Sequence, residues 1–189
     1  MSVVFFLSLR QYAEERFFYA ENQSLPTECD GRIINGHLPN AERGTRMIRK
    51  FEEKDSDRVM QIWLGGNIEA HDFVPKDYWL ENYQAVKEQL LQVDVYVYEQ
   101  NGEIHGFVGM TGNYLAGIFV DKNFRSKGIG KELLDCIKKN YPVFTLNVYK
   151  KNTRAVEFYL REGLTVSEAG IDEDTSEADF TMEWKNNDY

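Results

Sequence analysis

Two glycines stand one residue apart in RSKGIGKELLDCIKKN, residues 125–140, directly before a pattern typical of an amphipathic helix. Glycine costs roughly 1 kcal/mol relative to alanine inside a helix, so Gly128 and Gly130 indicate that bare backbone is needed where this helix begins. A helix start carries unpaired N–H groups and the positive end of the helix dipole, which attract anions. Arg125 and Lys127 add positive charge nearby. The stretch therefore predicts a site for a bulky anion such as a diphosphate.

The spacing of the glycines excludes two common nucleotide sites. The sequence contains no G-x-x-x-x-G-K-[ST] pattern, and G-x-G-x-x-G fails because position 133 is leucine. Taken alone, G-x-G is equally typical of a loop that only turns the chain and leaves its basic residues in solvent.

The elements that would position this site alternate between strand and helix. Period-two alternation and β-branched or aromatic runs predict strands, and apolar residues three to four apart predict helices. In chain order we expect a strand at 47–51, helices at 55–64 and 76–93, strands at 94–100, 103–111 and 114–121, the helix at 128–140, a strand at 143–148, a helix at 152–163, and strands at 164–169 and 179–184. Turn signals at 101–102 and 112–113 predict that the three strands before the glycines are antiparallel, and the two glycines at 65–66 are expected to end the first helix.

Composition limits the class of protein. The 189 residues, 42% hydrophobic and 28% charged, suit one α/β domain with an appendage. A net charge of −9 argues against a nucleic-acid partner and is compatible with a cationic substrate. Cys29 and Cys136 have no metal-type spacing, so we expect no metal and a reducing, cytoplasmic setting.

Residues 1–46 differ from the rest of the chain. SVVFFLSL is too short to span a bilayer and has neither a basic stretch before it nor a small-residue cleavage site after it, so we expect no membrane partner and no secretory signal. The turn-forming residues that follow show no sustained period. We expect 1–46 to be a leader, either a flexible or a non-native extension, and 47–189 to be the functional domain.

Two motifs carry a resemblance to a known family. RSKGIGKELL, preceded by LAGIFVDKNF, resembles the acetyl-CoA motif [QR]-x-x-G-x-[GA] of the GNAT superfamily of N-acetyltransferases, with Arg125, Gly128 and Gly130 at its fixed positions. LNVYKKNTRAVEFYLREGL resembles the second conserved region, N-x-x-A-x-x-F-Y-x-x-x-G-[FL]. The positions that match this region are Asn152, Ala155, Phe158, Tyr159 and Gly163. The resemblance covers roughly residues 47–184, and AHDFVPKDYW resembles a segment of the small bacterial acetyltransferases.

The resemblance implies a fold and a co-substrate. The fold is a single α/β domain with a mixed, mostly antiparallel sheet of about six to seven strands, flanked by helices and splayed between the fourth and fifth strands. The pantetheine arm of acetyl-CoA pairs with the fourth strand at Ile118 and Val120. Asn152 contacts the coenzyme and is also typical of a helix N-cap. The stretch that offers N–H groups to the diphosphate comprises Arg125, Ser126, Lys127, Gly128, Ile129 and Gly130.

The resemblance also implies catalytic roles. Tyr159 protonates the leaving thiolate, although a tyrosine at this spacing is alone more typical of a core position. Family members often use a carboxylate on the fourth strand as base, but positions 113–116 contain none. His71 is therefore the candidate base or acceptor contact, since histidine titrates in the right range. Glu69 and a water chain to solvent remain alternatives.

The acceptor is expected to be a primary amine, on a small molecule or a protein lysine, acetylated directly in a ternary complex. His71, Asp72 and Phe73 would contact it, and the acidic run IDEDTSEAD, residues 171–179, is either part of the acceptor mouth or a solvated hairpin loop. We expect a monomer or homodimer. Because the fourth strand lacks a carboxylate, a catalytically silent acyl-CoA-binding or sensory domain is the alternative.

Overall fold

The predicted strands join into one mixed sheet in the computed structural model, which describes residues 32–33 and 45–186. The strand order is β1-β2-β3-β4-β5-β6-β8-β7. The strands are β1 (Arg32–Ile33), β2 (Arg46–Lys50), β3 (Asp94–Gln100), β4 (Glu103–Thr111), β5 (Tyr114–Val120), β6 (Val143–Tyr149), β7 (Thr165–Ile171) and β8 (Ala178–Lys185). All neighbours are antiparallel except β5 and β6, which confirms the predicted mixed, mostly antiparallel sheet.

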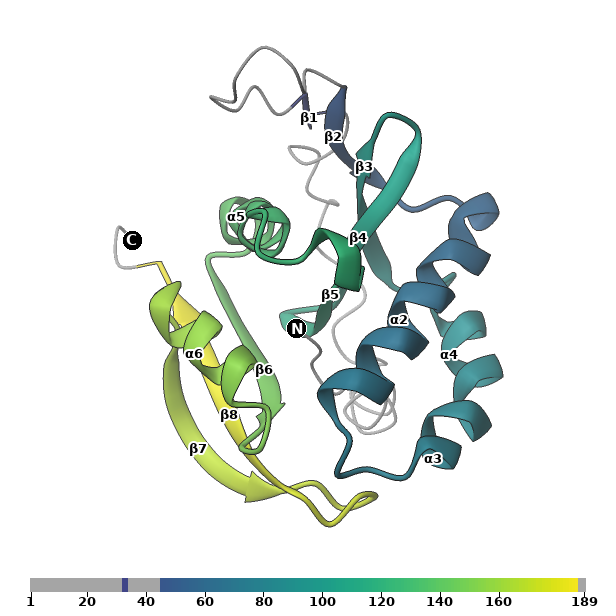
Figure 1. Ribbon diagram of the computed structural model, residues 1–189. Coiled ribbons are helices and arrows are strands. Elements are labelled where there is room, and N and C mark those ends of the chain that lie inside the picture. Colours follow the sequence, from purple (N-terminus) through teal and green to yellow (C-terminus); the bar gives the residue numbers. More distant parts are fainter. Residues whose placement is uncertain (1–31, 34–44, 187–189) are drawn as a thin grey trace.

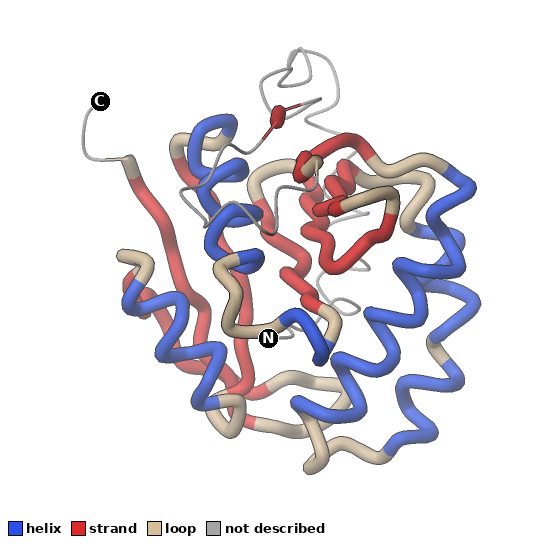
Figure 2. The backbone as a smooth tube through the Cα atoms, turned by 45° about the horizontal axis from the view of Figure 1, so that its top comes forward, coloured by secondary structure: helices blue, strands red, loops and turns tan. Residues whose placement is uncertain are grey.

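Helices cover both faces of the sheet. One face carries α2 (Ser56–Ala70), α3 (Lys76–Glu81) and α4 (Tyr83–Gln89), and the other carries α5 (Ile129–Asn140) and α6 (Thr153–Arg161) (Figure 1). Figure 2 shows the strands between these two groups of helices. The buried residues of α5 recur every three to four positions, so one apolar stripe faces the sheet.

Tight turns explain the run of antiparallel strands from β3 to β5. Asn101 and Gly102 both have positive φ, 55° and 81°, as a two-residue hairpin turn of type I′ requires. Gly112, with φ 55°, begins the second turn. The turn chemistry predicted from the sequence therefore sets the register of three neighbouring strands.

The sheet opens between β5 and β6, the fourth and fifth predicted strands. A single parallel pair, Tyr114 with Thr145, joins them, and Thr145 N donates to Asn113 O at 3.0 Å. Ala116 is an extra residue in the β4–β5 ladder, and such a bulge bends the strand that contains it. Beyond Tyr114 the two strands diverge, which confirms the predicted splay.

Two predicted helix boundaries are wrong. The glycines at 65–66 do not end α2, which continues to Ala70, and neither has positive φ. The predicted helix at 76–93 is broken at Asn82. Its Nδ2 donates to Tyr78 O at 2.8 Å and competes there with its backbone N, which lies 3.3 Å from the same carbonyl. The chain turns there from α3 into α4.

Most of the predicted leader lies outside the described residues. Within it, Ile33 pairs with Met47 and Arg32 with Ile48, so β1 extends the sheet at the edge formed by β2. β2 begins one residue before the predicted domain boundary, and Thr45 O accepts from Asn101 N at 3.1 Å. No helix in the described ranges is long and apolar enough to cross a bilayer.

Candidate active site

The loop between β5 and α5 presents bare backbone where α5 begins, as the two glycines predict. It passes through the short helix η3 (Lys122–Phe124), and Gly128 then forms the N-cap of α5 with φ 88°. A side chain at this φ would be strained, and a Cβ there would meet only Glu132 Oε1, at 3.8 Å. Ser126 also has positive φ, 62°. The first turn of α5 therefore exposes its N–H groups beside a tightly coiled loop.

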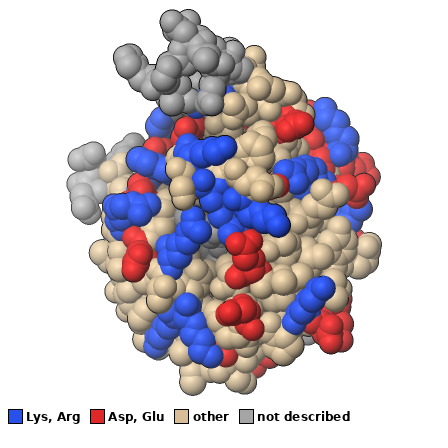
Figure 3. All heavy atoms as spheres, in the orientation of Figure 1, with Lys and Arg blue, Asp and Glu red and all other residues tan. Residues whose placement is uncertain are grey.

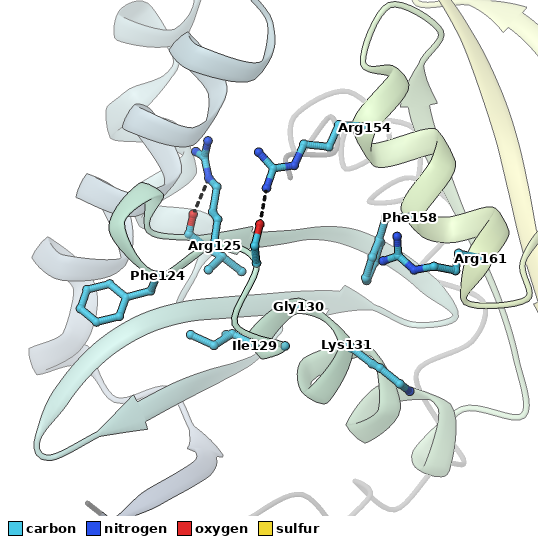
Figure 4. Close-up of a pocket in the computed structure, with 11 residues that line it drawn as sticks. Phe124, Arg125, Ile129, Gly130, Lys131, Arg154, Phe158 and Arg161 are labelled. Atoms are coloured by element: carbon cyan, nitrogen blue, oxygen red, sulfur yellow. Dashed lines mark hydrogen bonds between the residues drawn. The ribbon is translucent and has the colours of Figure 1, made fainter. Parts of the chain in front are cut away.

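A pocket of about 190 Å³ lies against this loop (Figure 4). Its lining consists of Val120, Phe124, Arg125, Ser126, Gly128, Ile129, Gly130 and Lys131 on one side, and Arg154, Phe158 and Arg161 of α6 on the other. Six of the predicted coenzyme-binding residues are thus brought together. Lys127 is beside the pocket, with its Nζ 4.8 Å from the centre of the Phe124 ring.

Positive charge is concentrated here. Lys and Arg side chains gather at the centre of the face shown in Figure 3. Arg125 donates from Nε to Val120 O at 3.2 Å, and its Nη1 lies 2.8 Å from Glu69 Oε1. This ion pair ties the end of α2 to the loop and occupies the carboxylate that was the alternative base. Arg154 Nη2 reaches across the pocket to Ser126 Oγ at 3.3 Å.

The backbone of β5 offers hydrogen-bonding groups toward the splay. Asp121 N donates to His105 O on β4 at 2.8 Å. Because alternate residues of an antiparallel strand turn their polar groups to the same neighbour, Val120 and Ile118 turn theirs away from β4, toward β6. Val120 lines the pocket, whereas Ile118 is fully buried and lies outside its lining.

Tyr159 lies on α6 with no exposed surface. Burial raises the pKa of its phenol above the ordinary value of 10.0, and Tyr114 on β5 raises it further. Its Oη has no hydrogen-bond partner among the described residues. The hydroxyl therefore keeps its proton and is buried close to the point where β5 leaves β6.

Asn152 and His71, predicted separately, are in contact. Asn152 is the N-cap of α6, and its Oδ1 accepts from Ala155 N at 3.2 Å. That bond orients the amide so that Nδ2 points to His71 Nε2, 3.1 Å away. Since an amide nitrogen only donates, His71 Nε2 accepts, and the ring is held in one tautomer. His71 has no exposed surface and touches the rings of Phe73, Trp79 and Tyr149.

The other residues expected to contact the acceptor amine are less enclosed than His71. Asp72 is exposed and Phe73 half-buried, with Lys151 Nζ 5.1 Å from the Phe73 ring centre. In the β7–β8 loop, Asp172 is buried and accepts from Thr175, whose Oγ1 is 3.0 Å from Tyr149 Oη. The acidic run is therefore partly built into the structure, packed near the aromatic group around His71.

Three of the pocket's cations were not singled out from the sequence: Lys131, Arg154 and Arg161. Arg154, Phe158 and Arg161 are spaced by four and three residues, so they lie on one face of α6. This spacing was available in the sequence as a signal. The facing partner was not, because Ser126 is 28 residues away from Arg154.

Known acetyltransferases are similar to this chain in sequence. The family described as "Acetyltransferase (GNAT) domain" matches residues 92–165. The chain is 31% identical over 121 residues to the peptidyl-lysine N-acetyltransferase YjaB of Salmonella typhimurium, covering 64% of this chain and 83% of the relative. It is 29% identical over 140 residues to the peptidyl-lysine N-acetyltransferase YiaC of Escherichia coli, covering 73% and 96%.

Solved structures are similar in fold. The apo form of YjaB from Escherichia coli matches with a TM-score of 0.65 and 23% identity, over 74% of this chain and 97% of that one. The PaiA N-acetyltransferase of Thermoplasma acidophilum, solved with coenzyme A, matches with a TM-score of 0.60 and 18% identity, over 74% and 98%.

Proposed function

The chain belongs to the GNAT acetyltransferases and is an acyltransferase, and on that premise we propose that it moves an acetyl group from acetyl-CoA to a lysine side chain of a protein. One observation carries the proposal: the basic pocket at the start of α5 adjoins the splay of β5 and β6, beyond which Tyr159 is buried. The site thus combines an anion-binding end with a proton donor.

The residues present fit the coenzyme. The exposed N–H groups at the start of α5, together with Arg125, suit a diphosphate, because oriented amides and guanidinium groups both bind phosphoryl oxygens. The polar groups that Val120 and Ile118 turn toward β6 suit the amides of a pantetheine arm, which would pair like an added strand. When bound, acetyl-CoA supplies an activated acetyl group as a thioester.

Tyr159 would hold the proton that the departing thiolate needs. A thiol titrates near 8.5 by analogy with cysteine, and the pKa of Tyr159 is raised by burial. The phenol therefore donates rather than accepts at neutral pH, which supports its role as general acid.

A protonated amine must also lose a proton before it can attack, and we assign this step to His71. The Asn152 amide occupies Nε2, so His71 would accept the proton when that amide yields. Proton removal through water toward Asp72 is the alternative, while Glu69 is held by Arg125. With Phe73, these residues form the proposed acceptor side.

The class of acceptor is inferred from the activity that the relatives are named for and from the negative charge near the proposed acceptor side. YiaC and YjaB are peptidyl-lysine N-acetyltransferases by name. In this chain, Asp72 and the loop at 172–177 place carboxylates near the acceptor side, which favours a cationic amine. Because the chain is an acyltransferase, a silent binding domain is no longer favoured.

An acceptor screen tests the proposal. Purified protein and acetyl-CoA are incubated with lysine peptides whose α-amine is blocked, with polyamines and with free amino acids, and thiol release and product mass are measured. We expect acetylation of the lysine ε-amine in peptides. Acetylation of small amines alone would contradict the peptide assignment, and no product from any amine would contradict the proposed function.

A further inference from the structure

Helix α6 forms a second wall of the pocket at the β5–α5 loop, opposite the start of α5. Arg154, Phe158 and Arg161 point from this helix toward the loop and the first turn of α5 (Figure 4). A ligand on the glycine backbone would therefore be approached by basic side chains from both sides. The acetyl-CoA motif accounts for only the α5 side of this arrangement.

The four cations that line the pocket differ in the partners they already have. Arg125 is paired with Glu69, Lys131 with Asp135 at 2.8 Å, and Arg161 with Glu162 at 3.3 Å. Arg154 has no carboxylate within ion-pair distance in the described part of the chain, and it donates to the neutral hydroxyl of Ser126. Its charge is therefore the least neutralised of the four.

We propose that Arg154 binds the diphosphate of the coenzyme from the α6 side, an inference that rests on the proposed function. The guanidinium already reaches the loop at Ser126 Oγ, 3.3 Å away, where the diphosphate would lie. A phosphoryl oxygen is a stronger acceptor than a hydroxyl, and a guanidinium can bind two such oxygens at once. The diphosphate would thus replace Ser126 as the partner of Arg154.

The position of Arg154 separates it from the other basic residue of α6. Arg161 follows it by seven residues, which corresponds to about 10 Å along a helix, and lies over the Phe158 ring. Arg154 faces the loop at Ser126, whereas Figure 4 shows Arg161 on the side of the pocket where Lys131 lies. Arg154 is therefore assigned to the diphosphate and not to the separate 3′-phosphate.

Calorimetric titration with three ligands tests this assignment. Acetyl-CoA carries both phosphate groups, its 3′-dephospho analogue carries only the diphosphate, and acetyl-pantetheine carries neither. Arg154→Ala is expected to weaken the first two ligands equally, by about 10- to 100-fold, because charge-assisted hydrogen bonds are lost. Acetyl-pantetheine should bind this variant as it binds the parent. Arg154→Lys, which keeps the charge but not the fork, should show a smaller loss.

A matched control separates local contact from net charge. Lys139→Ala removes one exposed positive charge from the last turn of α5, outside the pocket, and should leave all three affinities unchanged. Equal affinity of Arg154→Ala and parent for acetyl-CoA would overturn the inference while leaving the proposed function in place. If Arg154→Ala binds acetyl-CoA more weakly than the parent but binds the 3′-dephospho analogue equally well, the diphosphate assignment would be overturned. Failure of the parent to bind acetyl-CoA would overturn the proposed function itself.

Discussion

Burial decides what individual side chains of this site can do. Tyr159 and His71 both have no exposed surface, yet their surroundings differ. The Tyr159 hydroxyl is held in its protonated form by burial, which raises its pKa, and has no partner among the described residues. His71 is fixed by Asn152 and packed among aromatic rings. In the proposed mechanism, Tyr159 can therefore give a proton as it stands, whereas His71 must first be released by Asn152 to take one.

Replacing Tyr159 with phenylalanine tests the proton donor. The ring and its packing stay, and only the hydroxyl is lost, so turnover should fall by about 10²–10⁴ while acetyl-CoA affinity changes little. Because burial raises the pKa of this phenol above 10.0, its ionisation should cause no loss of rate below about pH 10 in the parent. Steady-state rates with the identified acceptor, and titration calorimetry, provide the measurements. Unchanged turnover would remove the assigned role.

Replacing Asn152 with aspartate tests His71 as the base. Aspartate caps a helix as well as asparagine does, so α6 should remain stable. A carboxylate facing Nε2 would favour the charged imidazolium, and the acid limb of the kcat/KM profile should move to higher pH if His71 removes the proton. An unmoved limb in a folded variant would assign proton removal to the route through water. Asn152→Ala, expected to destabilise the protein by about 1 kcal/mol, controls for loss of the cap.

At the scale of elements, the site depends on how β5, the glycine loop and α6 meet. The apolar run of β5 and the turn residues before it could be recognised in the sequence, because they are local patterns. The start of α5 was also predicted, since Gly128 does adopt a φ of 88°. These local signals together predicted the glycine loop before α5, whereas the splay beside it was implied by the resemblance to the family.

Long-range contacts explain what could not be predicted. His71 and Asn152 are 81 residues apart, and no local pattern indicates that the amide of one would hold the imidazole of the other. At the break, the side chain of Asn82 competes with its own backbone amide for the carbonyl of Tyr78, which the apolar spacing does not reveal. The place of Arg154 in the pocket likewise depends on its contact with Ser126, which precedes it by 28 residues.

Valine at position 128 tests the start of α5. At a φ of 88°, a β-branched residue is strained by at least about 1–2 kcal/mol, and its side chain would stand where a diphosphate must approach. We expect lower thermal stability together with a large loss of acetyl-CoA affinity. Gly102→Val is the matched control, because Gly102 has φ 81° and open space around it at the β3–β4 turn. It should lose similar stability but no affinity, and equal affinities of the two variants would argue against the phosphate loop.

At the scale of the whole molecule, the sheet consists of two parts joined by one residue pair. β1 to β5 form one part, and β6, β8 and β7 the other, with Tyr114 and Thr145 between them. α5 packs against the first part and α6 against the second, and the pocket is lined by both helices. The net charge of −9 is thus distributed unevenly, with a basic pocket at the junction of the two parts.

Shortening the chain tests how much the predicted leader contributes. A protein that begins at Thr45 retains all of β2 and the Thr45 O bond to Asn101, and of the residues that the structure describes it loses only the two-residue β1. We expect its acetyl-CoA affinity to be unchanged and its Tm to differ by a few degrees, since about 1 kcal/mol shifts Tm by roughly 2–4 °C at this size. Beginning at Met47 should cost slightly more. A Tm drop of more than about 10 °C would show that the removed residues supply part of the core.

The pocket ends at Val120, and this position has a consequence for the order in which the parts of acetyl-CoA bind. Ile118 and Tyr159 lie behind it with no exposed surface, so an arm that follows β5 must part core side chains after the phosphates have docked. Stopped-flow mixing with acetyl-CoA should therefore give a fast phase, whose rate rises with coenzyme concentration and falls with salt, and a slower phase whose rate reaches a plateau. 3′,5′-ADP, which lacks the arm, should give the fast phase alone. A single phase with the complete coenzyme would mean that the path along β5 is already open when the phosphates arrive.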